Sequence, residues 1–251
     1  DGNAGGGIYI SRGDDHQIGP YNVSSGNGGD GISIASAYPD RGDIFSNLIG
    51  TNIIGQAGLG NAGSGIAAYG NSSSRQDLWT IGGSSAADGN VISGNAAHGI
   101  FHERQVRDNV IANNVIGLSA DQLSPLGNGA DGIRLIGYSG SGAKPEGLSI
   151  DENVIAANGG SGIYAHAAQE TTVTRNQIGT NQAEDSGLGN GESGIYLYGG
   201  YYHDTEDWEI GGSSPSDANV IAHNADDGIR LRRGPGNRTC NDNAIFVNEF
   251  F

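Results

Sequence analysis

A glycine–isoleucine pair recurs along the whole chain, and this recurrence limits the possible folds more than any other feature. Successive pairs are separated by 24, 34, 34, 33, 30, 32 and 34 residues. A nearly regular interval of this length indicates a repeat architecture. The glycines of the pairs are Gly7, Gly31, Gly65, Gly99, Gly132, Gly162, Gly194 and Gly228.

A second motif, an Asn followed two residues later by Ile, lies between these pairs. Each repeat therefore contains at least two short segments. They are rich in β-branched residues, alternate with a period of two and are bounded by Gly, Asn and Ser, which is typical of strands. The backbone hydrogen bonds of strands this short, at a fixed spacing, are best formed when the chain winds into stacked coils. The motif begins at Asn47, Asn90, Asn114, Asn153, Asn176, Asn219 and Asn243.

Stacking predicts two interior columns of side chains, because residues i and i+2 of a strand point the same way. Ile8, Ile32, Ile66, Ile100, Ile133, Ile163, Ile195 and Ile229 form the first column. Ile10, Ile34, Ala68, His102, Leu135, Ala165, Leu197 and Leu231 form the second, in which His102 is the polar exception. The recurrent Asn is predicted to form a hydrogen-bonded ladder between coils, the alternative being a generic turn residue.

The segments "NVISGNAAHGI", "NVIAANGGSGI" and "NVIAHNADDGI" resemble the repeats of secreted bacterial right-handed parallel β-helix proteins of the pectin-lyase-like superfamily. The resemblance covers nearly the whole chain. It implies an all-β fold, a single right-handed parallel β-helix (solenoid) of about seven to eight coils formed by residues 1–251. The superfamily includes polysaccharide lyases, glycoside hydrolases, epimerases, adhesins and structural repeats, so the resemblance does not select a function.

The chain is strongly acidic, with a formal net charge of −16 at pH 7. Such a surface repels phosphate backbones and anionic lipids, so we expect no nucleic-acid partner. No apolar run is long enough to insert in a membrane. The first residue is Asp1, which we interpret as the start of a mature secreted product or of an excised portion, located outside the cell or on its surface. The lone Cys240 forms no internal disulfide, and its role is left open.

The two ends lack a recognisable capping segment. A second copy placed directly after the first would bring its Gly7 30 residues after Gly228, within the observed range of intervals. Exposed ends of a solenoid are templates for pairing. The leading hypothesis is therefore a secreted, non-catalytic structural protein whose copies stack head to tail into a filament or rod, the alternative being one piece of a longer solenoid. The residues expected at the contact are Ile8, Ile10, Ile245, Phe246, Val247, Phe250 and Phe251.

The residues that alternate with the interior columns are predicted to point outward and vary from coil to coil. Between residues 101 and 232 they combine aromatic rings with guanidinium groups, a combination that suits sugar rings. The alternative is that Tyr simply favours a solvent-facing strand. The glycan-binding candidates are Phe101, Tyr164, Tyr196, Tyr198 and Arg232.

The second hypothesis is a polysaccharide lyase or epimerase that uses this face, or a glycan-binding adhesin. Arg134 or Arg230 would neutralise a uronate carboxylate, and Tyr164, His166 or Tyr196 would abstract the neighbouring carbon-bound proton. No motif matches the catalytic residues of recognised pectate lyases, and no pair of carboxylates fits a glycosidase. We predict no cofactor and no metal centre. The segment "HDTEDW" at 203–208 is read as a solvated acidic loop, with Ca²⁺ binding as the alternative.

Overall fold

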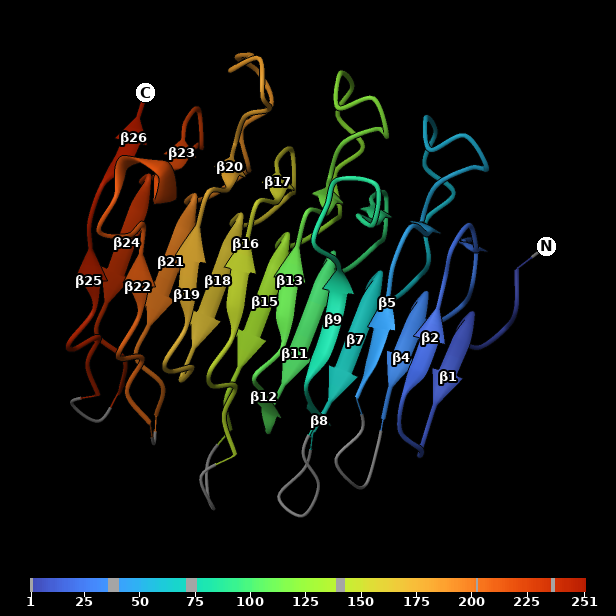
Figure 1. Ribbon diagram of the computed structural model, residues 1–251, viewed down its shortest axis with the longest axis horizontal. Coiled ribbons are helices and arrows are strands. Elements are labelled where there is room, and N and C mark those ends of the chain that lie inside the picture. Colours follow the sequence, from blue (N-terminus) through green and yellow to red (C-terminus); the bar gives the residue numbers. More distant parts are fainter. Residues whose placement is uncertain (1, 36–40, 71–75, 139–142, 202, 236–237) are drawn as a thin grey trace.

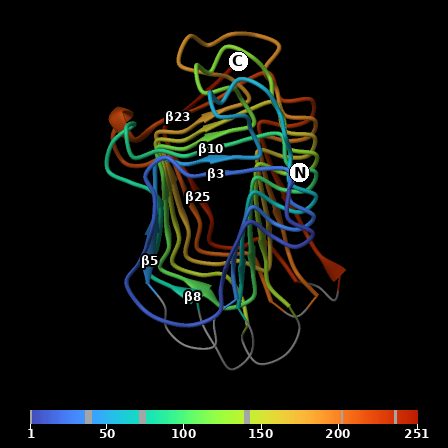
Figure 2. The same cartoon turned by 90° about the vertical axis from the view of Figure 1, so that its right-hand side faces the viewer.

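Each coil of the chain contains three strands, and equivalent strands of successive coils pair in parallel. In the computed structural model this produces three sheets of eight strands each, which form the three walls of one solenoid. Figure 2 shows the walls end on, as a prism with the chain winding around a common interior. The structure describes all residues except 1, 36–40, 71–75, 139–142, 202 and 236–237.

The strands are short, and their bounds repeat from coil to coil. Sheet A consists of β1 (Ile8–Ile10), β4 (Ile32–Ile34), β7 (Ile66–Tyr69), β11 (Ile100–Glu103), β15 (Ile133–Ile136), β18 (Ile163–His166), β21 (Ile195–Tyr198) and β24 (Ile229–Arg232). Sheet B consists of β2 (His16–Ile18), β5 (Gly42–Ile44), β9 (Trp79–Gly82), β13 (Val110–Ala112), β16 (Ser149–Asp151), β19 (Thr172–Thr174), β22 (Glu209–Ile210) and β25 (Ala244–Ile245).

Sheet C consists of β3 (Val23–Ser24), β6 (Leu48–Ile49), β10 (Val91–Ile92), β14 (Val115–Ile116), β17 (Val154–Ile155), β20 (Gln177–Ile178), β23 (Asn219–Ile221) and β26 (Asn248–Phe250). The strands β8 (Gln76–Asp77) and β12 (Val106–Arg107) form a small extra pair, and η1 (Pro215–Asp217) is a 3₁₀ turn. Among the described residues, no helix is long and apolar enough to cross a membrane.

The predicted interior columns are confirmed. Ile100, Ile133 and Ile163 are register partners in successive strands of sheet A, and all three are fully buried. His102 occupies the second column between Ala68 and Leu135 and is also fully buried. Neither of its ring nitrogens has a hydrogen-bond partner, and burial lowers its pKa to about 3. A neutral imidazole therefore occupies a position that is apolar in the other coils.

The glycine of each Gly-Ile pair is required by close packing. A Cβ at Gly132 would lie 2.6 Å from the side chain of Ile155 and 2.7 Å from the carbonyl oxygen of Gly162 in the next coil. No other residue fits this corner without displacing the interior. The isoleucine columns and the glycines that precede them are thus one packing unit.

The predicted Asn ladder is present. In each step the backbone N–H and side-chain amide of one Asn donate to the Oδ1 of the equivalent Asn in the next coil, as in the steps from Asn90 to Asn114 and from Asn114 to Asn153. A second ladder, which sequence analysis missed, runs between sheets C and A. Its members are Asn3, Asn27, Asn61, Asn95, Asn128, Asn158, Asn190 and Asn224.

One predicted ladder member was wrong. Asn243 does not follow Asn219, because the strand after it, β25, pairs with β22 of sheet B. Asn248 takes the position instead and accepts hydrogen bonds from the backbone and side chain of Asn219. Asn243 accepts from the backbone N–H of Trp208. The local sequence around Asn243 fits either corner, and the pairing of β26 with β23 decides between them.

Three longer turns protrude from the end of sheet C at residues 51–59, 118–126 and 180–188, and form the tall loops at the top of Figures 1 and 2. They contact one another in series. The N–H of Ala120 donates to the carbonyl of Gly55, and the Asn181 side chain donates to the carbonyl of Gln122. Leu118 and Leu188 form a small second core with Val154 on the outer side of sheet C. These loops therefore cover the part of sheet C around Val154, whereas Val23 in β3 stays exposed.

Candidate functional site

The outer face of sheet A brings most of the predicted site residues together. Register pairs Arg134 with Tyr164, Tyr164 with Tyr196, and Tyr196 with Arg230, so these four side chains form one outward column across β15, β18, β21 and β24. The neighbouring outward column contains His166, Tyr198 and Arg232 in the same register. The two columns lie two residues apart along each strand, about 6.6 Å at the usual rise per residue.

Asp131, at the corner before β15, fixes Arg134. Its Oδ2 lies 2.7 Å from Nη1 of Arg134 and 3.4 Å from Nδ1 of His98, and its Oδ1 accepts the N–H of Ser161 at 2.8 Å. The Asp131 side chain is 5% exposed. Burial favours the protonated acid, but the contacts with His98, Arg134 and Ser161 together lower the pKa of Asp131. A buried, ionised carboxylate therefore holds the guanidinium.

Aromatic contacts continue this arrangement along the column. The guanidinium carbon of Arg134 lies 4.3 Å from the centre of the Tyr164 ring, and Tyr164 meets Tyr196 edge to face at 5.3 Å. Both geometries are favourable for aromatic rings. Burial raises the pKa of Tyr164 to about 12, although the Arg134 charge opposes this rise. The Tyr164 phenol is therefore protonated at neutral pH and can donate a proton.

The second outward column contains His166, a side chain that can act as a general base. The rings of His166 and Tyr198 stack with their centres 5.4 Å apart. On the next strand, the guanidinium carbon of Arg232 lies 5.8 Å from the centre of the Tyr198 ring. Burial and the charge of Arg134 lower the pKa of His166, so its ring is neutral at pH 7. Within the described part of the chain, no hydrogen-bond partner occupies its nitrogens. The His166 side chain is half-buried.

The three guanidinium groups differ in their partners. Arg134 is paired with Asp131, and Arg230 lies 3.3 Å from Asp226 and 3.8 Å from Asp227. Arg232 is exposed and donates to the Tyr196 hydroxyl at 3.5 Å, and no described carboxylate lies within 4.0 Å of it. The available positive charge of this face therefore lies at Arg232, which the sequence predicted only as a glycan contact.

A shallow groove of about 440 Å³ runs beside the first column. Its walls are the side chains of Asp131, Arg134, Tyr164, Glu192 and Tyr196, and its floor is the glycine-rich corner at 129–130 and 159–160. Carboxylates, phenols and a guanidinium thus line one continuous surface. Such a mixture of apolar faces and hydrogen-bonding groups suits a hydroxyl-rich ligand.

Phe101, the remaining predicted glycan contact, lies towards the N-terminal side of this group. It stacks on His98 at 5.5 Å and meets Tyr69 edge to face at 5.8 Å. The Tyr69 hydroxyl donates to Asp30, and burial raises the pKa of Tyr69. Ala67, the register partner of Phe101, alternates with the interior columns and was therefore expected to point outward, but it is fully buried.

Sequence analysis missed Asp131 and His98 as parts of the site. Both directly precede a Gly-Ile pair and so lie at a corner, outside the outward columns that alternation predicts. The signal was available, because residues at the same corner of adjacent coils lie about one strand spacing apart. The distance from His98 to Asp131 follows from that equivalence.

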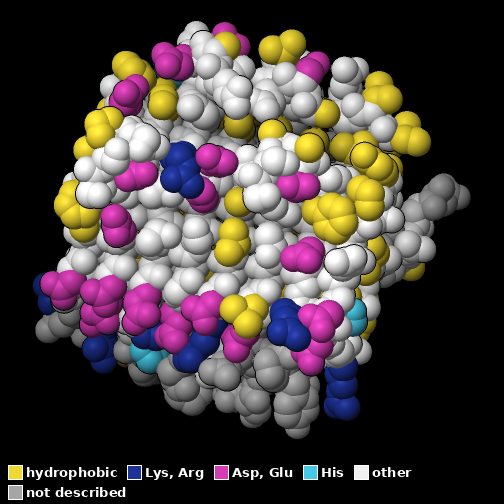
Figure 3. Space-filling view, viewed as in Figure 1, with side chains coloured by type: hydrophobic (Ala, Val, Ile, Leu, Met, Phe, Trp, Pro, Cys, Tyr) yellow, Lys and Arg dark blue, Asp and Glu magenta, His cyan; other side chains and the backbone are white. Residues whose placement is uncertain are grey.

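The other faces have different chemistry. Figure 3 is viewed towards sheet B and shows acidic and basic side chains in a band along its lower edge, with few charges on the middle of the sheet. The "HDTEDW" loop lies among such groups: Asp204 accepts the N–H of Thr239 and Glu206 accepts from Gln169. Among the described residues, no group of three or more His, Cys, Asp or Glu side chains is arranged to hold a metal ion.

Comparison with known proteins gives structural likenesses only. No family model matches the chain, and no curated protein matches it. A mutant of the periplasmic alginate epimerase AlgG has a TM-score of 0.63 at 14% identity, covering 98% of this chain and 48% of that one. The A-module of Azotobacter vinelandii mannuronan C-5 epimerase AlgE6 has a TM-score of 0.53 at 13% identity, covering 97% and 56%.

The chain thus spans about half the length of the solved structures that it matches. At identities this low the likeness concerns the path of the backbone, and function has to be argued from the site. With its three parallel sheets and these structural neighbours, the chain has the right-handed parallel β-helix fold that its repeats predict.

Proposed function

We propose that this protein acts on a uronate-containing polysaccharide with the outer face of sheet A, as a C5 epimerase or a lyase. Both reactions begin with removal of the proton at C5, next to the carboxylate. The two solved epimerases support this reading over a purely structural role, because they act on polyuronates with the same backbone architecture. The periplasmic location named for one of them supports a site of action outside the cytoplasm.

The observation that carries the proposal is the arrangement of Arg232 and His166 on either side of Tyr198. A guanidinium without a carboxylate partner can neutralise a substrate carboxylate, which acidifies the C5 proton. A neutral imidazole with open nitrogens can accept that proton. The pKa of His166 is lowered by burial and by Arg134, so the base form is present at neutral pH.

The two columns provide groups on both sides of a bound ring. A sugar standing on edge between them would have His166 on one side and the phenols of Tyr164 and Tyr196 on the other. After His166 takes the C5 proton, the electron pair is delocalised into the carboxylate. Return of a proton from a phenol on the opposite side inverts C5. In the lyase reaction the C4–O bond breaks instead, the leaving oxygen takes a proton from a phenol and departs as a hydroxyl, and a C4–C5 double bond remains.

Proton abstraction can be tested directly in deuterated water. Mannuronan, alginate and polygalacturonate are incubated with the protein, and deuterium at C5 is measured by NMR together with the ultraviolet absorbance of an unsaturated product. We expect deuterium incorporation with at least one polymer. Absence of both signals with all three would contradict an enzymatic role, and a glycan array would then decide whether the face only binds sugars.

Two variants locate the reaction. His166→Gln should lower C5 exchange by 10²–10⁴-fold, the usual contribution of a general base. Arg232→Gln should also reduce exchange, because the guanidinium that neutralises the substrate carboxylate is then missing. Thr172→Ser, on the outer face of sheet B, is the matched control and should have no effect.

End-to-end association is a second candidate, favoured by the direction of the Asn ladders. Every step donates towards the C-terminal coil, so the N-terminal coil presents the Oδ1 of Asn3 and Asn22, whereas the C-terminal coil presents the N–H groups of Asn224 and Asn248. A head-to-tail copy could continue both ladders. The other predicted contact residues divide unevenly between the two end coils: Ile8 is partly buried and Ile10 is 9% exposed, while Ile245, Phe246, Val247, Phe250 and Phe251 are 43–68% exposed.

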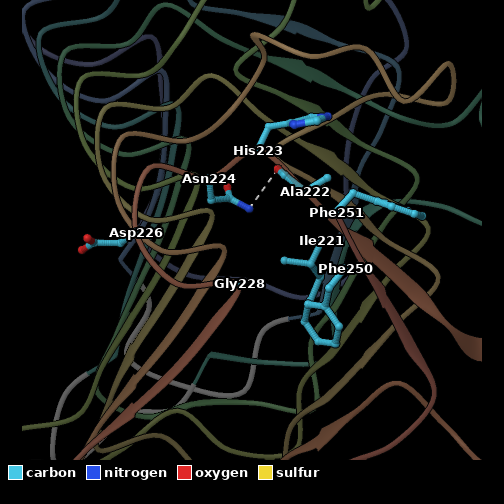
Figure 4. A pocket seen from close by; sticks show the side chains of 8 residues that line it. All are labelled: Ile221, Ala222, His223, Asn224, Asp226, Gly228, Phe250 and Phe251. Atoms are coloured by element: carbon cyan, nitrogen blue, oxygen red, sulfur yellow. Dashed lines mark hydrogen bonds between the residues drawn. The ribbon is translucent and has the colours of Figure 1, made fainter.

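Figure 4 shows the C-terminal coil, where Phe250 and Phe251 border a cavity of about 240 Å³ with Ile221 and His223. Sedimentation velocity over a wide concentration range tests the association. We expect species larger than the monomer that Phe250→Asp and Phe251→Asp convert to monomer. A wild-type monomer at high concentration would contradict this second candidate and leave the enzymatic proposal unaffected.

A further inference from the structure

Two aspartates occupy the same corner of the solenoid three coils apart, and they differ in the partners of one carboxylate oxygen. Asp30 and Asp131 each precede a Gly-Ile pair, and each accepts at 2.8 Å the backbone N–H of the serine at the next corner, Ser64 or Ser161. Each aspartate therefore caps the next corner in the same way. A cap of this kind is expected of a short acceptor at a tight corner.

The remaining oxygen distinguishes them. Oδ2 of Asp30 accepts two neutral hydroxyls, those of Ser33 and Tyr69, both at 2.9 Å. Oδ2 of Asp131 receives the guanidinium of Arg134 at 2.7 Å. In both cases the partner three residues on comes from the outward column of the following strand. Only at Asp131 is that partner charged.

The tether at Asp131 is built more rigidly than a surface ion pair. Its carboxylate is nearly excluded from water, and Nδ1 of His98 lies 3.4 Å from Oδ2 of Asp131. Arg134 is held from below by Asp131 and from the side by the Tyr164 ring, which in turn meets Tyr196. Three other side chains of the groove wall, Arg134, Tyr164 and Tyr196, are thus connected in series to one carboxylate.

We propose that Asp131 is a positioning residue of the sugar site: it acts through Arg134, which it holds over Tyr164, and so sets the geometry of the phenol column against a bound ring. The effect of Asp131 on catalysis rests on the proposed function. The contact by which Asp131 holds Arg134 does not. Asp131 does not bind the carboxylate of a uronate, since like charges repel. Its negative charge opposes binding of a polyanion, and its contribution appears in the chemical step.

The test compares Asp131→Asn with Asp30→Asn. Both variants retain an oxygen for the serine N–H, and both lose one negative charge. Only Asp131→Asn removes the anion that holds a guanidinium. Side-chain NMR of the arginine Nε–Hε groups, with the Arg134 signal assigned through Arg134→Lys, measures the tether without substrate. We expect the Arg134 order parameter to fall from near the rigid value of about 0.85 to below about 0.6 in Asp131→Asn and to stay unchanged in Asp30→Asn.

Kinetics on the polyuronate that shows C5 exchange provide the second readout. Misplacing a group by about 1 Å costs up to roughly 10²-fold, so kcat of Asp131→Asn should fall tenfold to a hundredfold. KM should be unchanged or lower, because one repulsive charge is gone. Asp30→Asn should retain the wild-type kcat. If Asp131→Asn fails to fold, Arg134→Gln, which leaves the serine cap intact, must show the same loss of kcat with no rise in KM.

Three results would overturn the inference: an ordered Arg134 in Asp131→Asn, an equal loss of kcat in both aspartate variants, or a loss of kcat that merely follows a lower melting temperature. A wild-type protein without C5 exchange contradicts the proposed function instead. In that case the NMR comparison alone decides whether Asp131 holds Arg134.

Discussion

The inner and outer sides of sheet A belong to the same eight strands and follow opposite rules. Inward, the first position is Ile in every strand; outward, the position between the two interior columns changes with almost every coil. Ile133 is fully buried, whereas its neighbour Arg134 points into the groove. The inward residues of each strand therefore specify the coil, and the outward residues are free to vary for binding and chemistry.

The largest expected effect concerns the polar part of the interior. Asn114 accepts from Asn90 and donates to Asn153 and to the carbonyl of Ile81, all buried. In Asn114→Leu these groups lose their partner at about 1–3 kcal/mol each, so we expect a loss of at least about 3 kcal/mol in the free energy of unfolding, measured in urea. Asn3→Leu, at the end of the other ladder, should cost about 1 kcal/mol. Equal losses would show that the ladder does not stabilise the coils.

The next effect compares neighbours on opposite sides of one strand, away from the site. Ile111 is fully buried and Val110 is 37% exposed. We expect Ile111→Ala to cost about 2–5 kcal/mol, because it leaves a cavity in the core. Val110→Ala should stay within about 0.5 kcal/mol, as is usual for surface substitutions. Similar costs for the two variants in urea unfolding would break the distinction between an invariant inside and a permissive outside.

A smaller effect concerns His102, the one polar residue among the interior columns. Its folded pKa, about 3, is below the ordinary value of 6.5, so below pH 6.5 the unfolded chain binds the proton more readily. The stability difference between wild type and His102→Leu should therefore be constant above pH 6.5 and grow as the pH falls towards 3, by at most about 1.4 kcal/mol per pH unit. Melting temperatures of both proteins across this range provide the measurement. Parallel curves would mean that His102 is not buried as described.

His102→Leu should in addition stabilise the protein at neutral pH by about 1–3 kcal/mol, since two unpartnered nitrogens leave the core. Val106→Leu, at another buried position of the same coil, is the control for added bulk and should leave the pH dependence unchanged.

The interior could be predicted because burial in each coil imposes the same residue at each repeat. The strands of sheet B were less visible: His16–Ile18 and Ser149–Asp151 share no motif, and only their pairing makes them equivalent. Asn243 was placed in the wrong corner for the same reason, since two corners accept similar sequences.

The candidate site could be predicted as a set of residues on one face of the fold, but the contacts between these residues could not. Alternation alone placed Tyr164, His166 and Tyr196 on one face. The pairing of Arg230 with Asp226 and Asp227 depends on how the corner before β24 turns, which alternation does not describe. For that reason the exposed Arg232, which emerged as the available charge, had been assigned no catalytic role.

Hydrogen exchange of the backbone with and without an oligouronate tests most directly the claim that the outer face of sheet A is the functional surface. We expect slower exchange of amides at the outward residues and corners of β15, β18, β21 and β24, and unchanged exchange in sheets B and C. Protection confined to sheet B, or to the loops that cover sheet C, would contradict it.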